Sequence, residues 1–442
     1  MKTRILTPGA SLVLAATLVT ALAACGGGGD EAEGSGGDGG GGTLTYWASN
    51  QGASLDNDME ILTPEIEKFE EQTGIQVDVE VVPWSDLTNN TLAAAVSGQG
   101  PDVINIGNTN AVTFQSTGAF HEFTDEDFEQ LGGKDRFVDS ALGTAGAEGQ
   151  PPTSIPLYSQ VYALYYNKQM FADAGLEPPA TWEDLVSSAQ ALTDPDAGRY
   201  GIVIPGGTVN VSMHMAFILS EQDGGSAFDD DGKPTFTSDG MVAGVKRYVD
   251  LLSEYHVVNP SVAQFTEGPQ AAGEFARGNA AMYMAQTASM NVLRENGMTP
   301  DQYGIVPIPA PQGGDQIGSF VAGTNISIFE NTDNLDAALQ FVEFMTSDEE
   351  QEILNEAYTS LPVVEGLQPT FEAEPEQLET WATIVADYAK PLPLVPEIQA
   401  FQANVGEAVV SLIAQAASGG AVSEDDVRAA LEEAQQKMGA TS

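Results

Sequence analysis

The sequence is poor in basic residues. Its 442 residues include 15 Lys and Arg against 64 Asp and Glu, so the formal net charge is −49. Such a chain lacks a basic face that could displace counterions, which excludes a general nucleic-acid binder. The same charge argues against docking on anionic lipid through a basic patch. We interpret the acidity as a solvated surface, and adaptation to a saline habitat remains an alternative.

Cysteine and histidine are also scarce. The single cysteine, Cys25, excludes an intrachain disulfide and a Cys-rich zinc site. The three histidines, His121, His214 and His256, are too widely spaced to supply a metal pair on one helix. The sequence has no nucleophile elbow, no phosphate-binding P-loop and no zinc-protease helix motif. We therefore predict no metal, no cofactor and no catalytic residue, although the many carboxylates leave a glycosidase-type pair open.

The first 24 residues have the pattern of a secretory signal peptide. Lys2 and Arg4 provide a short positive start, and residues 5–24 carry no charge. The alternative is a membrane-spanning anchor, but Pro8 and Gly9 shorten the helix that would have to cross the bilayer. We expect a signal peptide over residues 1–24.

A lipid anchor is predicted directly after this segment. Leu22-Ala23-Ala24-Cys25 resembles the lipobox of bacterial lipoproteins, which implies processing before Cys25 and lipidation of its thiol. Two acyl chains suffice for stable anchoring to a membrane. The stretch that follows is rich in Gly, Asp, Glu and Ser, so residues 25–42 are expected to form a lipidated, flexible tether.

Strand and helix patterns alternate after the tether. Residues 75–81 alternate apolar with polar side chains, which predicts a half-buried strand. Thr63 with Pro64 predicts the start of the preceding helix, and Gly74 predicts its end. The β-α-β-α-β order that continues to residue 106 indicates an α/β fold with a largely parallel sheet.

A second strand–helix series begins near residue 155. Helix starts with reciprocal capping are expected at Thr181 with Asp184, Ser347 with Glu350, and Ser423 with Asp426. The sequence contains no internal repeat.

Residues 156–173, PLYSQVYALYYNKQMFAD, resemble the signature of the family 1 extracellular solute-binding proteins. These are the binding components of bacterial ABC importers, mostly for sugars, and include the maltose-binding proteins. Tyr158 departs from the family pattern. Shorter matching pieces follow in the family's order, and the resemblance covers nearly all of residues 43–442. These pieces lie at residues 100–103, 181–185, 275–282, 307–309 and 341–345.

The resemblance implies the two-lobed periplasmic-binding-protein fold of type II, with α/β lobes that close on a ligand by hinge motion. The three interlobe crossings are expected at residues 156–158, 307–310 and 360–364. Lobe 1 then comprises 43–157 and 309–362, and lobe 2 comprises 158–308 and 363–442. The resemblance also implies a monomer that catalyses nothing and delivers a carbohydrate to an ABC permease served by a separate ATPase subunit.

A neutral sugar needs flat apolar faces for its C–H surfaces, and amides or carboxylates for its hydroxyls. We looked for such side chains on segments that the resemblance places at the cleft. The alternative for Trp47 is a place in the core, and the alternative for Trp84 is a contact that staples the start of a helix. In the first half of the chain the candidates are Trp47, Asn50, Gln51, Trp84, Asn108, Asn110, Tyr158 and Gln160. Later in the chain they are His214, Gln286, Ser319 and Phe320, with Asn210 and Ser212 beside His214.

Three positions depart from the maltose-binding proteins. Ala288 and Gln402 stand where those proteins stack tryptophan on the sugar, and Gly406 replaces a sugar-binding arginine. The resemblance therefore implies a different oligosaccharide or a disaccharide rather than maltodextrin. A binding protein for a polyamine or peptide, and a secreted glycan-active enzyme, remain the alternatives.

Overall fold

The structure is a computed structural model that describes residues 42–229 and 231–441. The predicted signal peptide and Cys25 lie outside the described residues, as does the tether except for its last residue. No helix within the described ranges combines the length and the apolar character that a membrane span requires.

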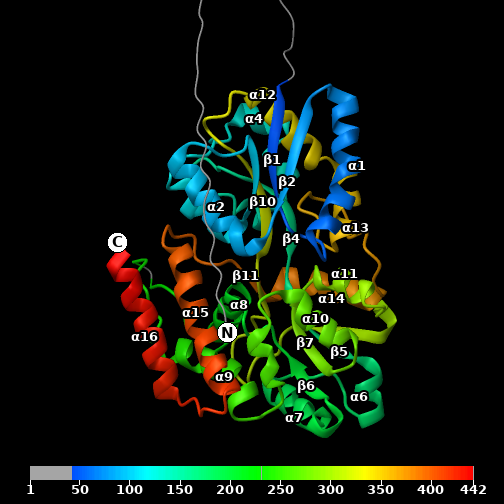
Figure 1. The fold of residues 1–442 in the computed structure, drawn as a ribbon, viewed down its shortest axis with the longest axis vertical. Helices are drawn as coiled ribbons and strands as arrows, with labels where there is room; N and C mark the ends of the chain where they lie inside the picture. The colour runs from blue at the N-terminus through cyan, green and yellow to red at the C-terminus, as the bar shows by residue number, and fades with distance from the viewer. Residues whose placement is uncertain (1–41, 230, 442) are drawn as a thin grey trace, which may run out of the picture. The chain divides into compact units, whose positions relative to one another are not determined.

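The first lobe is built on a five-stranded mixed sheet of order β2-β1-β3-β10-β4 (Figure 1). β1, β2 and β3 are parallel, as predicted. β10 comes from a distant part of the chain and runs antiparallel to both β3 and β4. The other four strands run in one direction, so the sheet is largely parallel, as expected, with β10 as the exception. The strands are β1 (Thr43–Ser49), β2 (Gln76–Val82), β3 (Val103–Gly107), β4 (Ile155–Gln160) and β10 (Ala322–Ile328).

Helices cover both faces of this sheet. They are α1 (Leu55–Thr73), α2 (Trp84–Ser97), η1 (Asn108–Asn110), α3 (Ala111–Gln115), α4 (Asp125–Gln130), η2 (Lys134–Arg136), α5 (Asp139–Leu142), α12 (Leu335–Met345) and α13 (Asp348–Tyr358). Gly74 ends α1 in the left-handed conformation, as predicted. The predicted start was wrong, because Ser54 caps α1 by accepting the Asn57 N–H and Pro64 lies inside the helix.

The second lobe contains a four-stranded sheet of order β6-β7-β5-β8 (Figure 1). β6 and β7 are parallel, whereas β5 runs antiparallel to β7 and to β8. The strands are β5 (Tyr162–Asn167), β6 (Tyr200–Val203), β7 (Ala280–Gln286) and β8 (Tyr303–Val306). A separate pair of short parallel strands joins β9 (Ser319–Phe320) to β11 (Ala389–Lys390).

Helices pack around this second sheet, and α8 and α15 lie against each other. The helices are α6 (Lys168–Ala174), α7 (Trp182–Leu192), η3 (Pro195–Ala197), α8 (Val209–Gln222), α9 (Asp239–Ser253), η4 (Pro260–Gln264), α10 (Gly268–Ala276), α11 (Ser289–Glu295), η5 (Pro300–Gln302), α14 (Pro375–Thr383), η6 (Ile384–Tyr388), α15 (Ile398–Ala417) and α16 (Glu424–Thr441).

The predicted capping boxes divide into two outcomes. Thr181 with Asp184 forms the reciprocal pair of hydrogen bonds, and Ser423 with Asp426 does the same. Ser347 accepts the Glu350 N–H, which is half of the third box. The other half was wrong, because the Glu350 carboxylate turns to Lys68, with its Oε1 2.6 Å from Nζ.

Each lobe has its own apolar core, and the second crossing between them lies later than expected. The second-lobe core includes Phe320 and Ala322, the first residue of β10, whereas Ile326 and Ile328 further along β10 pack in the first-lobe core. Gln222 holds the intervening loop in the second lobe by donating to the carbonyl oxygens of Ile308 and Ile317. Residues 309–321 therefore belong to the second lobe, and their assignment to the first was wrong.

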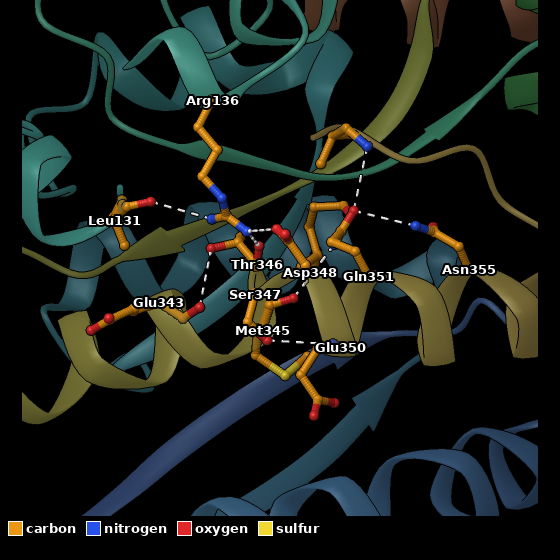
Figure 2. Close-up of polar contacts among 12 residues, drawn as sticks. Leu131, Arg136, Glu343, Met345, Thr346, Ser347, Asp348, Glu350, Gln351 and Asn355 are labelled. Atoms are coloured by element: carbon orange, nitrogen blue, oxygen red, sulfur yellow. Dashed lines mark hydrogen bonds and ion pairs between the residues drawn. The ribbon is translucent and has the colours of Figure 1, made fainter. Parts of the chain in front are cut away.

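The third crossing is fixed by α13, whose polar contacts are drawn in Figure 2. The Gln351 side chain donates to the carbonyl of Leu157 at 2.9 Å and accepts the Val363 N–H at 3.3 Å. Glu365 then donates its N–H to the carbonyl of Arg136, so the chain is still bound to the first lobe at that point. Leu361 and Phe371 both belong to the second-lobe core, so the chain contacts both lobes over residues 361–371.

Candidate functional site

A cavity of about 570 Å³ lies between the two lobes. This volume is within the range of small-molecule sites. Its first-lobe side is formed by the segments that follow β1, β3 and β4, together with the starts of α2 and β10. Its second-lobe side is formed by the starts of β5, α8 and α10, the end of β7, and parts of α11, β9 and α15. The cavity thus lies outside the carboxyl ends of β1, β3 and β4, where ligands bind in open α/β sheets.

Most of the predicted site residues line this cavity. From the first lobe these are Asn50, Gln51, Trp84, Asn108, Asn110 and Gln160, and from the second lobe they are His214, Gln286 and Phe320. Asn210, Ala288 and Gln402, which were singled out beside them, also line it. The structure therefore brings together side chains that lie hundreds of residues apart in the chain.

Trp47 and Tyr158 do not line the cavity. Trp47 packs beneath α2, because strand alternation turns it to the opposite face of β1 from Tyr46 and Ala48. Tyr158 shares a face of β4 with Gln160 but lies one step deeper, with its ring 5.4 Å from that of Tyr358. Their prediction as ligand contacts is corrected, because both belong to the packing of the first lobe.

Ser319 is also absent from the lining. Its hydroxyl accepts the Tyr162 N–H at 2.8 Å and donates to the Phe320 carbonyl at 2.7 Å. The side chain is fully buried, so its hydroxyl donates to and accepts from protein groups and is not available to a ligand. Ser319 positions the two aromatic residues that do face the cavity.

Sequence reasoning missed several lining residues. Tyr162 begins β5, within the stretch that carries the family signature. Glu267 precedes the Gly-Pro start of α10, and Thr324 lies within β10. The Gly-Pro start was visible in the sequence, but nothing in it showed that this helix start faces the first lobe.

Gln51 is held rigidly in the first-lobe wall. Its Nε2 donates to Ser49 Oγ at 2.8 Å and to Thr324 Oγ1 at 3.0 Å, and its Oε1 accepts from Gln160 at 3.2 Å. Its backbone N–H donates to Asp58, which also accepts the Gly52 N–H and the Asn50 amide. Burial raises the pKa of Asp58 despite these donors.

The asparagines that follow β3 are fixed in a similar way. Asn108 Nδ2 donates to Thr144 Oγ1 at 3.3 Å and to the Val321 carbonyl at 3.0 Å. Its Oδ1 accepts no hydrogen bond from any residue that the structure describes, so one acceptor of this amide is unused there. Asn110 donates to Thr88 at 3.3 Å and accepts from Gln402 of the second lobe at 2.9 Å.

Aromatic rings form the centre of the second-lobe wall. Tyr162 Oη lies 2.7 Å from His214 Nδ1, and the ring centroid of His214 lies 4.5 Å from that of Phe320. Burial lowers the pKa of His214 to about 3, so the ring is neutral near pH 7. When Nδ1 accepts the Tyr162 proton, Nε2 carries the hydrogen and is a donor.

Two amides accompany these rings. Asn210 and His214 are four residues apart on α8, so both reach the cavity, whereas Ser212 between them is fully buried. The Asn210 and Gln286 side chains make no hydrogen bond to any residue in the ranges 42–229 and 231–441. Their hydrogen-bonding capacity is therefore open to a ligand.

The cavity contains little charge for so acidic a protein. Glu267 is the one carboxylate among the described lining residues, and no Lys or Arg accompanies it there. Burial, and then repulsion from Asp86, raise the pKa of Glu267. Within the described part of the chain, no group of His, Cys, Asp and Glu side chains is arranged to hold a metal ion. A neutral polar ligand suits this lining best.

Comparison with known proteins gives a family match over residues 52–352, to the bacterial extracellular solute-binding proteins. A putative binding protein of Brucella abortus is 23% identical over 279 residues, which cover 62% of this chain and 65% of that protein. The diacetylchitobiose binding protein of Streptomyces coelicolor is 25% identical over 366 residues, which cover 80% of each chain.

A solved structure shows the same fold. The ABC substrate-binding protein of Listeria monocytogenes in complex with cycloalternan matches with a TM-score of 0.76 at 19% identity, covering 90% of this chain and 99% of that one. The α/β two-lobed fold expected from the sequence is thereby confirmed. The family match spans most of the described residues, and this chain belongs to the bacterial extracellular solute-binding proteins.

Proposed function

We propose that this chain captures an uncharged carbohydrate between its two lobes and delivers it, chemically unaltered, to the permease of an ABC importer. The observation that carries this proposal is the lining of the interlobe cavity, in which amides, hydroxyls and aromatic rings predominate over charged groups. Anions would find no cationic partner among the described lining residues.

The two kinds of side chain match the two surfaces of a sugar. Trp84 is half-buried and offers a ring face for C–H groups, and the half-buried His214, which packs on Phe320, offers a ring edge. Asn210 and Gln286 have free hydrogen-bonding groups for hydroxyls. A micromolar dissociation constant requires about 8 kcal/mol, which is attainable when such groups are held in place before the ligand arrives.

The relatives support a carbohydrate rather than another solute. The Streptomyces coelicolor protein is named for diacetylchitobiose, and the Listeria monocytogenes structure holds cycloalternan. A polyamine would need several carboxylates, whereas the described lining supplies Glu267 alone. A retaining or inverting glycosidase needs a pair of carboxyl groups, so the same count argues against catalysis in this cavity.

The proposal includes a location and an assembly state. The protein acts as a monomer outside the cytoplasm, and a lipid on Cys25 ties it to the cell membrane. The lipobox-like residues that end at Cys25 support the anchor. Hydrolysis of ATP belongs to a separate subunit of the importer.

Isothermal calorimetry on the detergent-solubilised full chain tests the function. The panel contains neutral mono- and oligosaccharides, with spermidine and short peptides as competing classes. We expect heat from at least one neutral carbohydrate and its recovery unaltered by mass spectrometry. Heat from spermidine or a peptide with none from any sugar, or conversion of the bound sugar, would overturn the proposal.

The anchor is tested separately, by metabolic labelling with a radioactive fatty acid. We expect the label on the natural chain and none on Cys25→Ala, which leaves the membrane fraction. Unchanged membrane retention of Cys25→Ala would refute the anchor while leaving the binding function standing.

A further inference from the structure

Gln402 connects the two lobes across the cavity. It lies in the second turn of α15 and is 7% exposed. Its Nε2 donates to Asn110 Oδ1 at 2.9 Å, and its Oε1 accepts from Thr109 Oγ1 at 3.2 Å. Both ends of one amide therefore engage η1 of the first lobe, and we call this pair of contacts the Gln402 bridge.

A second contact supports the bridge from the same side. Thr113 of α3 donates to the carbonyl of Pro396, just before α15, at 2.8 Å. The two lobes are thus joined at two places on this side of the cavity, by the Gln402 bridge and by the contact between Thr113 and Pro396. Gln402, Thr109 and Asn110 all line the cavity, and we call this part of its lining the end wall.

The cavity has no comparable end wall where α1 faces α11. Ser54 and Leu55 line it from the first lobe, and Ser289 and Val292 line it from the second. Within residues 42–229 and 231–441, no hydrogen bond joins these two segments. Leu55 is 39% exposed, which indicates that this side is open to solvent.

The position of α15 is fixed by close packing. Gly406 lies one turn beyond Gln402, and a Cβ there would stand 2.5 Å from the carbonyl oxygen of Val209 on α8. A side chain at this position would force the two helices apart. The helix cannot slide away to admit a longer ligand without breaking this contact. Room at this end can be gained only by removing the Gln402 side chain.

We propose that Gln402 determines the length of the carbohydrate that the site accepts. The bridge blocks extension of a chain past α15, so the cavity takes a short ligand whose further residues can project only toward the α1 and α11 side. This inference rests on the proposed function, because it assigns a size limit to the same site.

Gln402→Ala is the variant that tests this limit. Removing the amide deletes the end wall and the bridge together, so longer members of a homologous series gain contacts that the natural chain denies them. Gln399→Ala is the matched control, since Gln399 is on the same helix and does not line the cavity. Thr109→Val removes one bridge contact with little change of shape, and serves if Gln402→Ala unfolds.

The measurement is calorimetry of the full chain against one sugar series from monomer to heptamer. We expect the natural chain and Gln399→Ala to lose affinity beyond a short member. In Gln402→Ala, the affinity for longer members relative to shorter ones should rise tenfold or more, with a smaller rise in Thr109→Val. Melting curves of each variant establish that it is folded.

Three results would overturn the inference. A natural chain that binds long and short members equally has no size limit. A change in Gln402→Ala by the same factor at every length makes the bridge a general closure contact and not a length determinant. Absence of binding by every sugar would overturn the proposed function and this inference with it, and is distinguishable from the first two because those require measurable binding.

Discussion

The two walls of the cavity differ in how their polar groups are used. In the first lobe, the side-chain amides form hydrogen bonds with neighbouring protein groups, as in Gln51, Asn108 and Gln160. In the second lobe, Asn210 and Gln286 have none within the described residues, and the rings around Phe320 provide the contact surface. One wall is organised by a polar network and the other by aromatic packing.

This difference indicates a division of labour in recognition. Amides held by their neighbours present fixed donors and acceptors, which lowers the entropy lost on binding. Packed rings present a stiff apolar face with the same advantage. Free amides at the edge of that face can then adjust to individual hydroxyls. The comparison suggests variants that disturb one wall and spare the other.

The largest effect is expected from Asp58→Ala. Asp58 accepts the N–H groups of Gln51 and Gly52 and the Asn50 amide, so its loss leaves several buried donors without a partner. The unfolding free energy should fall by about 3 kcal/mol. Urea denaturation provides the measurement, with the exposed Asp56→Ala as control. Equal stability of the two variants would show that the first-lobe wall does not depend on this carboxylate.

Trp84 is the exception to the comparison, as the one aromatic side chain that the described first-lobe wall contributes. Trp84→Ala should weaken carbohydrate binding by about 2 kcal/mol, because a large ring face is lost to the ligand. Trp84→Phe should recover part of this loss. If calorimetry gives Trp84→Ala the affinity of the natural chain, stacking comes from the second lobe alone.

Acid should weaken the second lobe through His214. Its folded pKa of about 3 lies below the unfolded value of 6.5, so the unfolded chain takes up a proton first as the pH falls. Stability is therefore lost below pH 6.5, by about 2 kcal/mol at pH 5. His214→Gln should remove this dependence in urea titrations at both pH values. A variant with the slope of the natural chain would show that His214 is not the responsible group.

In the first lobe, Glu350 should make the unfolding free energy depend on pH in the opposite direction and to a smaller extent. Burial raises its pKa above the ordinary 4.5, although Lys68 favours the charged form and Glu65 opposes it. The folded chain then holds this proton more tightly, so stability falls as the pH rises above 4.5. This loss of stability with rising pH should vanish in Glu350→Gln. A slope that persists in this variant would assign it to another carboxyl.

The sequence predicted the order of elements and the two-lobed fold because local patterns and the family resemblance agreed. Gly74 ended its helix as expected, since the left-handed conformation there favours glycine. The antiparallel direction of β10 was not predictable, because pairing of β10 with β3 depends on residues more than two hundred positions apart. The second crossing was misplaced for a similar reason, since Gln222 holds residues 309–321 from a distant helix.

The site was predictable where polar residues follow a strand and less so elsewhere. Asn50, Asn108 and Gln160 follow or end strands of the first lobe, and all line the cavity. The prediction for Tyr158 was wrong because Tyr158 lies in the core, although Gln160, two residues later on the same face of β4, lines the cavity. Ser319 failed because its hydroxyl is used by Tyr162, which is a contact that only the fold reveals.

The central claim is that a neutral carbohydrate lies between the amide wall and the aromatic wall. A crystal structure of the full chain grown with the best sugar from calorimetry tests this most directly. The account predicts an unaltered sugar inside the interlobe cavity, with its C–H groups against the ring face of Trp84 or the ring edge of His214 and hydroxyls bonded to Asn210 and Gln286. A sugar bound elsewhere on the surface, or a cleaved one in the cavity, would contradict it.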